Sequence, residues 1–176
     1  MYHLCMDTRN TAEAIIRKFS IPGSLVDIKV NTQGHINSTF ISTFEKDGKR
    51  AKYTHQRINS NVFPHPDEVM ENIVRVTEHI RKKTAGLPDA ERRSLRVVMA
   101  ADGRPYTIDA EGMYWRTYGF IDGVKTYDKV PGEDTAYSLG KGIGAFQSEL
   151  SDFDSSKLYT VIPRFHDMRM RYMQLS

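Results

Sequence analysis

The chain has 176 residues, enough for one ordinary domain or for one lobe of a larger enzyme with part of the next. Hydrophobic residues make up 39% and aromatic residues 10%, which supports a packed core and excludes a wholly disordered chain. A formal charge of +3 is too weak, without a focused basic patch, to indicate a nucleic-acid-binding protein.

Cysteine content and hydropathy limit the compartment. The lone Cys5 excludes an internal disulfide framework and a cysteine-based zinc site, and it is typical of a reducing compartment. The sequence contains no signal-peptide pattern and no apolar run near the roughly 20 residues of a membrane span. We therefore expect a cytoplasmic protein that binds neither membrane nor nucleic acid.

The first predicted element is a helix over residues 8–19. Asn10, followed three residues later by Glu13, forms a capping box that can satisfy the free N–H groups of the first turn. Apolar residues then recur at the spacing of one helix face, at Ala12, Ile15, Ile16 and Phe19.

Three segments with the alternation of β-strands follow this helix, at residues 25–30, 36–44 and 50–58. The turn Lys46-Asp47-Gly48-Lys49 joins the second to the third as a hairpin, because Asp-Gly tolerates the left-handed backbone that such turns need. Three consecutive antiparallel strands are therefore predicted.

The hydrophobic period then changes to that of a helix, with Val69, Ile73, Val76 and Ile80 on one face. A long helix is predicted over residues 66–83, with Pro66 and Asp67 suited to its first turn. After a polar loop, two further strands are predicted near residues 95–100 and 113–120. The element order predicts an α+β fold with one helix on an antiparallel sheet.

Glycine, proline and charged residues concentrate between Gly119 and Gly132, which is typical of a domain boundary. Helical patterns resume over residues 134–150 and 163–173. We therefore expect one lobe over residues 1–121 and the start of a second over residues 122–176.

Gly34 opens a candidate phosphate-binding turn between the first two strands. A glycine lets the main chain approach phosphate oxygens, and successive backbone N–H groups can form an anion-binding cradle. The same pattern also fits a glycine hairpin that binds no ligand. Taken alone, the turn leaves both interpretations open.

Short motifs in a recognisable order run over nearly the whole chain. They are Gly34 to Phe40, Gln56-Arg57-Ile58-Asn59, Val62-Phe63-Pro64, Met70-Glu71-Asn72-Ile73, Trp115 to Ile121, Gly144-Ala145-Phe146-Gln147, Phe153-Asp154, and Phe165-His166-Asp167 with Arg171. On these motifs the chain resembles the N-acetylhexosamine 1-kinases, which belong to the aminoglycoside phosphotransferase and choline kinase superfamily.

The resemblance implies a protein-kinase-like fold. Residues 1–121 would form an N-terminal nucleotide-binding lobe, with a five-stranded antiparallel sheet and one packed helix. Residues 122–176 would form a hinge and the first helices of a helical C-terminal lobe. The implied activity is ATP-dependent phosphorylation of the anomeric hydroxyl of an N-acetylhexosamine or related sugar, with magnesium as cofactor.

The resemblance also implies which residues contact the nucleotide. The turn at Gly34 would cover the phosphates, and the main chain of the hinge would bond to adenine. The implied nucleotide-binding residues are Gly34, His35, Asn37, Thr39, Gln56, Tyr118, Phe120 and Ile121.

One departure from protein kinases concerns charge. Those enzymes pair a lysine on the third strand with a glutamate on the following helix, and by position these places hold Gln56 and Asn72. Gln56 brings no positive charge to the phosphates, and the adjacent Arg57 points to the opposite strand face. The sugar 1-kinases that the chain resembles also have glutamine there. A purely structural tie between Gln56 and Asn72 is the alternative interpretation.

No catalytic residue or metal ligand is assigned within the chain. In the superfamily the catalytic and magnesium-binding aspartates follow the hinge at some distance, so we expect both beyond Ser176. We interpret His166 and Asp167 as part of a helix cap rather than a catalytic loop. The carboxylates Glu149 and Asp152, with Asp154, are interpreted as solvated surface rather than a glycosidase acid/base pair.

Two hypotheses about function therefore stand. The chain is the front part of a sugar kinase and is inactive alone, or it is a non-catalytic module that binds a nucleotide or a partner. In either case, we expect that its exposed lobe surface can also pair with a second copy.

Overall fold

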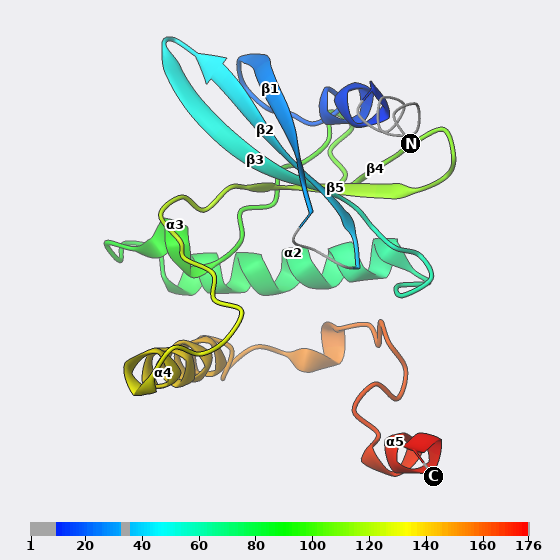
Figure 1. Ribbon diagram of the computed structural model, residues 1–176, viewed down its shortest axis with the longest axis vertical. Coiled ribbons are helices and arrows are strands. Elements are labelled where there is room, and N and C mark those ends of the chain that lie inside the picture. Colours follow the sequence, from blue (N-terminus) through cyan, green and yellow to red (C-terminus); the bar gives the residue numbers. More distant parts are fainter. Residues whose placement is uncertain (1–9, 33–35, 176) are drawn as a thin grey trace.

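A computed structural model describes residues 10–32 and 36–175 of the protein. It is a mixed α+β structure built on one five-stranded antiparallel sheet with the strand order β1-β2-β3-β5-β4 (Figure 1). The strands are β1 (Ser24–Asn31), β2 (Ser38–Lys46), β3 (Lys49–Arg57), β4 (Thr107–Ile108) and β5 (Tyr114–Gly119). The predicted α+β class and antiparallel meander are thus confirmed.

The hairpin between β2 and β3 forms at the predicted place. Asp47 and Gly48 have φ angles of 52° and 71°, the left-handed values at both central residues of a two-residue turn. This turn matches the right-handed twist of the strands and pairs Lys46 directly with Lys49. All later pairs of the two strands follow from that register.

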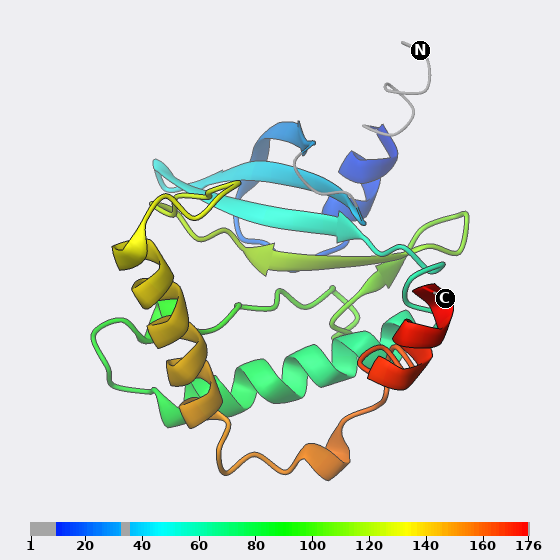
Figure 2. The same ribbon diagram turned by 60° about the horizontal axis from the view of Figure 1, so that its bottom comes forward.

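A helical segment over residues 10–16 covers one face of the sheet (Figure 2). Its apolar residues, with Phe19, pack on side chains that β2 and β5 direct to the same face, including Phe40 and the fully buried Trp115. The core cluster consists of Ala12, Ile15, Ile16, Phe19, Ile28, Phe40, Phe44, Tyr53, Ala100 and Trp115. The predicted apolar face of this helix is confirmed for the described residues.

Helix α2 (Pro66–Lys83) lies on the opposite side of the sheet and has the predicted bounds (Figures 1 and 2). Pro66 stands in the first turn, where its missing N–H costs nothing. Val69 and Ile80 are buried, and the intervening apolar residues of that face are half-buried. At its end, the hydroxyl of Thr84 donates to the carbonyl of Ile80.

The predicted strand at residues 95–100 is wrong. That segment makes single antiparallel bridges from Val97 to Tyr118 and from Ala100 to Phe19, and the fourth strand is instead β4. The outer edge of β5 is divided, because β4 pairs with its first half and Val97 with its second. A turn at Gly103, with φ of 82°, separates the two partners.

Two helices also differ from prediction. The loop expected after α2 contains the short helix α3 (Ala90–Arg93). The helix expected over residues 163–173 is α5 (Met168–Leu175), because Arg164 has a left-handed φ of 57° that interrupts helical structure. Asp167 instead caps α5 by accepting from the backbone N–H of Met170 at 2.9 Å. The interpretation of Asp167 as a helix cap is confirmed.

The remaining elements are α4 (Glu133–Glu149) and the short 3₁₀ helix η1 (Ser155–Lys157). Helices α4 and α5 lie near opposite ends of α2 (Figure 2). Neither contains a buried residue. Within the described ranges, no helix combines the length and apolar character needed to cross a membrane.

A buried carboxylate fixes the β4–β5 turn. Asp109 accepts hydrogen bonds from the backbone N–H groups of Glu111 and Met113, each at 2.9 Å, and from the indole of Trp115 at 2.8 Å. The Arg57 guanidinium lies 3.4 Å from the same carboxylate, which is 2% exposed. Asp109 therefore joins β3, the turn and the core tryptophan.

We predict that Asp109→Ala lowers the free energy of unfolding by about 3–5 kcal/mol, because it leaves the indole and the Arg57 charge without their buried partner. Urea denaturation measures the change. Asp102→Ala is the control: Asp102 also closes a turn, onto Arg104, but is exposed, and stability close to the unchanged protein is expected. Equal losses in both variants would contradict the prediction.

His55 is buried between two hydroxyl groups. Its ring nitrogens lie 2.7 Å from Ser42 Oγ on β2 and 2.8 Å from Thr117 Oγ1 on β5. Burial lowers the pKa of His55 from 6.5 to about 3, because the protonated ring would lose its hydration. The folded protein therefore holds this ring neutral.

The depressed pKa predicts a pH dependence of stability. Below pH 6.5 the unfolded chain binds a proton at His55 that the folded chain refuses, so stability falls as pH drops, by up to about 1.4 kcal/mol per pH unit. Urea denaturation at pH 7 and pH 5 measures it. His55→Asn, which keeps hydrogen-bonding atoms but does not titrate, should show a smaller loss. The same pH dependence in both proteins would show that protonation of His55 does not cause the loss of stability.

Candidate functional site

One row of polar side chains crosses the central strands on the face turned away from the N-terminal helix. Thr39 on β2 is the direct partner of Gln56 on β3, and Gln56 is the direct partner of Arg116 on β5. Their strand neighbours, such as Phe40 and Trp115, point into the core on the other face. Alternation along the strands thus aligns three polar side chains without any helix contributing.

The row is joined by hydrogen bonds that run in one direction. Arg116 Nε donates to Gln56 Oε1 at 3.0 Å, and Gln56 Nε2 donates to Thr39 Oγ1 at 3.2 Å. The Thr39 hydroxyl donates to the carbonyl of Asn37 at 3.4 Å. Each donor is therefore oriented by its neighbour, and the row leads from β5 to the start of β2.

Asn37 has a structural partner on the segment after β3. Its Oδ1 accepts from the backbone N–H of Asn59 at 2.9 Å, while the Asn59 amide donates to the carbonyl of Ile36 at 3.1 Å. These contacts hold the two residues before β2 beside the segment that follows β3. Gly34 and His35, two of the predicted phosphate-binding residues, lie outside the described residues.

The predicted hinge, residues 118–121, begins within β5, because Tyr118 and Gly119 are the last two residues of that strand. Tyr118 is buried, and burial raises the pKa of its phenol. The backbone N–H of Gly119 donates to the carbonyl of Arg96, and that of Phe120 donates to the carbonyl of Lys52. Ile121 follows, half-buried, as the chain leaves the sheet. Main-chain contacts to a ligand would therefore use the hinge carbonyls or the amide of Ile121.

Of the residues predicted to bind the nucleotide, the structure brings Asn37, Thr39 and Gln56 together and places Tyr118 two residues beyond Arg116 on the same face. Sequence reasoning missed Arg116. The missed signal was the alternation of β5: the residue after the core residue Trp115 must face the other side of the sheet. The register with β3 then places Arg116 beside Gln56.

The proposed tie between Gln56 and Asn72 is wrong. The Asn72 amide donates to the carbonyl of Tyr159 and accepts from its backbone N–H, both at 2.9 Å. Gln56 bonds within the sheet instead. Asn72 therefore joins α2 to the segment after η1 and not to β3.

Further polar contacts attach α2 to the C-terminal segment. Asp152 accepts from Lys83 at 2.6 Å and lies 3.1 Å from the His79 ring, which packs edge-on against Phe153. Arg75 donates to the carbonyl of Lys157. Asp152 therefore lies at an exposed position, where it joins α2 to the segment after α4.

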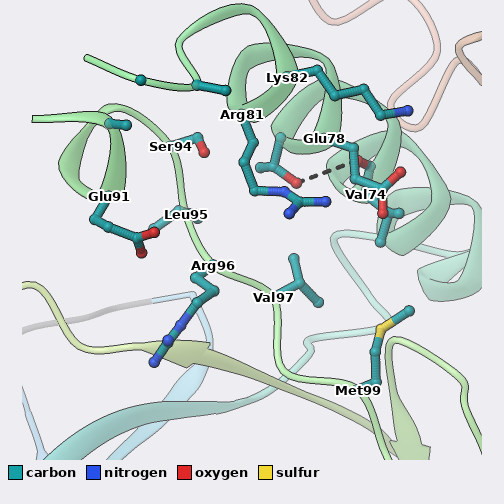
Figure 3. Close-up of a pocket in the computed structure, with 14 residues that line it drawn as sticks. Val74, Glu78, Arg81, Lys82, Glu91, Ser94, Leu95, Arg96, Val97 and Met99 are labelled. Atoms are coloured by element: carbon teal, nitrogen blue, oxygen red, sulfur yellow. Dashed lines mark hydrogen bonds between the residues drawn. The ribbon is translucent and has the colours of Figure 1, made fainter. Parts of the chain in front are cut away.

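A cavity lies elsewhere, beside the C-terminal half of α2 (Figure 3). It has a volume of about 680 Å³ and is bounded by α2, α3 and residues 94–99. Arg81 projects into it from α2, while Arg96 lies at its border with its guanidinium turned toward Gly119 of β5. Its charged side chains are all exposed and hydrated, so it offers weak recognition for a small ligand.

No protein-family model matches the chain. Among the described residues, no group of three or more His, Cys, Asp or Glu side chains could hold a metal ion. The row Thr39–Gln56–Arg116 is therefore the candidate site on geometry alone.

We predict that Asn72→Ala speeds hydrogen exchange at the backbone N–H of Tyr159 by about 2- to 10-fold, because that amide loses its acceptor. Exchange followed by NMR measures it. Gln56→Ala is the control and should leave the Tyr159 amide unchanged, since Gln56 bonds only within the sheet row. Faster exchange of the Tyr159 amide in Gln56→Ala would contradict the prediction, because it would indicate that the side chains of Gln56 and Asn72 are coupled.

Proposed function

We propose that the chain is the nucleotide-binding part of an ATP-dependent small-molecule kinase. The observation that carries the proposal is the polar row Thr39–Gln56–Arg116, which stands between the predicted hinge and the beginning of β2 on one sheet face. The sequence motifs that resemble the N-acetylhexosamine 1-kinases fall on the same elements. The proposed fold is accordingly a protein-kinase-like N-terminal lobe followed by the start of a helical lobe.

The chemistry of the row suits a phosphate chain. Phosphoryl transfer depends on holding the phosphates in place and offsetting their charge, more than on covalent chemistry by the protein. Arg116 supplies a cation, and the Gln56 amide and the Thr39 hydroxyl supply neutral polar groups. Because hydrogen bonds already orient these groups, little reorganisation would be needed on binding.

The adenine would lie against the chain after β5. This segment leaves the sheet at Gly119, and its two first amides are held by Arg96 and Lys52, which makes its position rigid. Phe120 offers an aromatic surface, with Lys52 Nζ 5.3 Å from the ring centre. A rigid edge with an apolar surface supports adenine binding.

The fit differs for the two expected cofactors. The described residues offer donors for the phosphates of ATP, but they do not fit a magnesium site, because no cluster of carboxylates or histidines is present among them. Magnesium ligands and the catalytic aspartate are therefore proposed to come from other residues. The sugar acceptor, an N-acetylhexosamine phosphorylated at the anomeric hydroxyl, is proposed from the motif resemblance.

A second candidate function has one supporting observation. Helices α4 and α5 expose large apolar side chains, including Tyr137 at 74%, Met168 at 77% and Tyr172 at 74% exposure. A helix without a buried face gains little stability from packing, so another polypeptide surface is expected to cover these helices. A non-catalytic partner-binding module, which could include self-association, is therefore the alternative to a kinase.

We predict that adenine nucleotides bind the chain weakly, near millimolar, because the described part provides donors but no metal site. In an NMR titration, adenosine and ATP should both shift the amides of residues 118–121. Only ATP should also shift Thr39 and the side-chain amide of Gln56. No phosphorylation of N-acetylglucosamine by the purified chain is expected.

The cavity of Figure 3 supplies the internal comparison, because Arg81 and Arg96 line it without an ion-pair partner among the described residues, and it belongs to a different surface. Shifts confined to Arg81, Arg96 and their neighbours would mean that anions bind by surface charge alone. Such a result, or no shift with either ligand, would contradict a nucleotide site on the sheet.

A further inference from the structure

Arg116 is a half-buried cation without a carboxylate partner in the described ranges. Its Nε donates to the neutral amide of Gln56, and its guanidinium lies 5.4 Å from the ring centre of Tyr118. Neither contact neutralises the charge. A positive charge that is partly withdrawn from water gains most from an anionic partner.

The other arginines of the neighbouring strand are neutralised. Arg57 pairs with Asp109 and Glu111, and Arg50 pairs with Glu45 at 2.8 Å. Lys52 on the same strand pairs with Asp122 at 2.9 Å. The arginines of β3 thus have carboxylate partners, whereas Arg116 on the adjacent β5 has none in the described ranges.

The guanidinium also has donors to spare. The bond to Gln56 uses Nε, and no hydrogen bond within the described part of the chain uses either Nη group. Gln56 and the Tyr118 ring hold the planar group on the side of the sheet that the row occupies. A planar fork of free N–H groups fits two oxygens of a phosphate.

The position along β5 is also informative. Tyr118, the first hinge residue, follows Arg116 by two residues and lies on the same face, which separates them by about 6.6 Å along the strand. The row then continues from Arg116 across β3 to β2. A nucleotide whose base contacts the hinge would place its phosphates over this row.

We propose that Arg116 binds the phosphate oxygens of the nucleotide and supplies the positive charge that Gln56 lacks. The assignment rests on the proposed function, because it requires a nucleotide on this face of the sheet. The phosphate-binding cation then comes from β5, while Gln56 on β3 holds the guanidinium in place. This arrangement needs no ion pair between β3 and α2.

The test compares ADP with adenosine, both without magnesium, by calorimetry or NMR titration of the full chain. Arg116→Met keeps an extended apolar side chain but removes the charge. We expect it to weaken ADP about 10- to 100-fold and to change adenosine affinity less than about twofold, because adenosine has no phosphate. Arg116→Lys should recover part of the ADP affinity, since it retains a point charge but loses the fork.

Arg50→Met is the matched control. It removes the same charge from the same sheet, at an exposed site paired with Glu45 near the β2–β3 hairpin. ADP affinity should remain within about twofold of the unchanged chain, because solvent and salt screen so distant a charge. An equal loss of ADP affinity in Arg116→Met and Arg50→Met would overturn the assignment, because it would show that ADP responds to the net charge of the protein and not to Arg116.

Resonances of the Arg116 side chain provide a second measurement that needs no variant to fold. In the unchanged protein, ADP should shift the Arg116 Nε and Nη signals, whereas adenosine should leave them in place. If ADP binds without shifting these signals, and Arg116→Met binds ADP as tightly as the unchanged protein, only the role of Arg116 is overturned. Failure of both ligands to bind the unchanged chain would remove the proposed function and this assignment together.

Discussion

The register of the three central strands depends on the buried ring of His55. Its two nitrogens bond to Ser42 on β2 and Thr117 on β5, so one side chain on β3 joins both neighbours. A slip of one residue would turn every side chain to the opposite face and leave these polar groups buried without partners. Because His55 faces the core, Gln56 must face the other side, next to Arg116.

Local signals predicted much of the fold. Asp47-Gly48 specified the β2–β3 hairpin. Apolar residues spaced alternately four and three apart, with Pro66 at the start, predicted the extent of α2. The segment at residues 95–100 was mistaken for a strand because its apolar residues Val97 and Val98 fit a strand as well as an edge segment. The segment forms only single bridges because β4 occupies the first half of the β5 edge and leaves only the second half for Val97. This depends on contacts between distant residues, which a local sequence pattern does not contain.

The candidate site was predictable where strand alternation governs it and unpredictable where distant contacts do. Thr39 and Gln56 could be identified from their strands, and Arg116 follows by the same alternation once the register is known. The partner of Asn72 could not be identified from the sequence, because it is the backbone of Tyr159, 87 residues further along the chain. Only the packing of the C-terminal segment against α2 determines which way that amide points.

Because Asn72 bonds to the C-terminal segment and not to β3, orienting the polar row and holding the C-terminal segment are done by different contacts. An ion pair between β3 and α2 would make the row depend on the helix. The polar row is held entirely by bonds among β2, β3 and β5, so its donors keep their orientation without help from α2. Helix α2 instead uses Asn72 and Lys83 to hold the C-terminal segment, and its apolar side to contact the sheet. A shift of α2 would therefore move the C-terminal helices relative to the row and leave the row itself intact. If the chain is the front of a two-lobed enzyme, as proposed, this division would let the second lobe reposition without disturbing the groups proposed to bind phosphate.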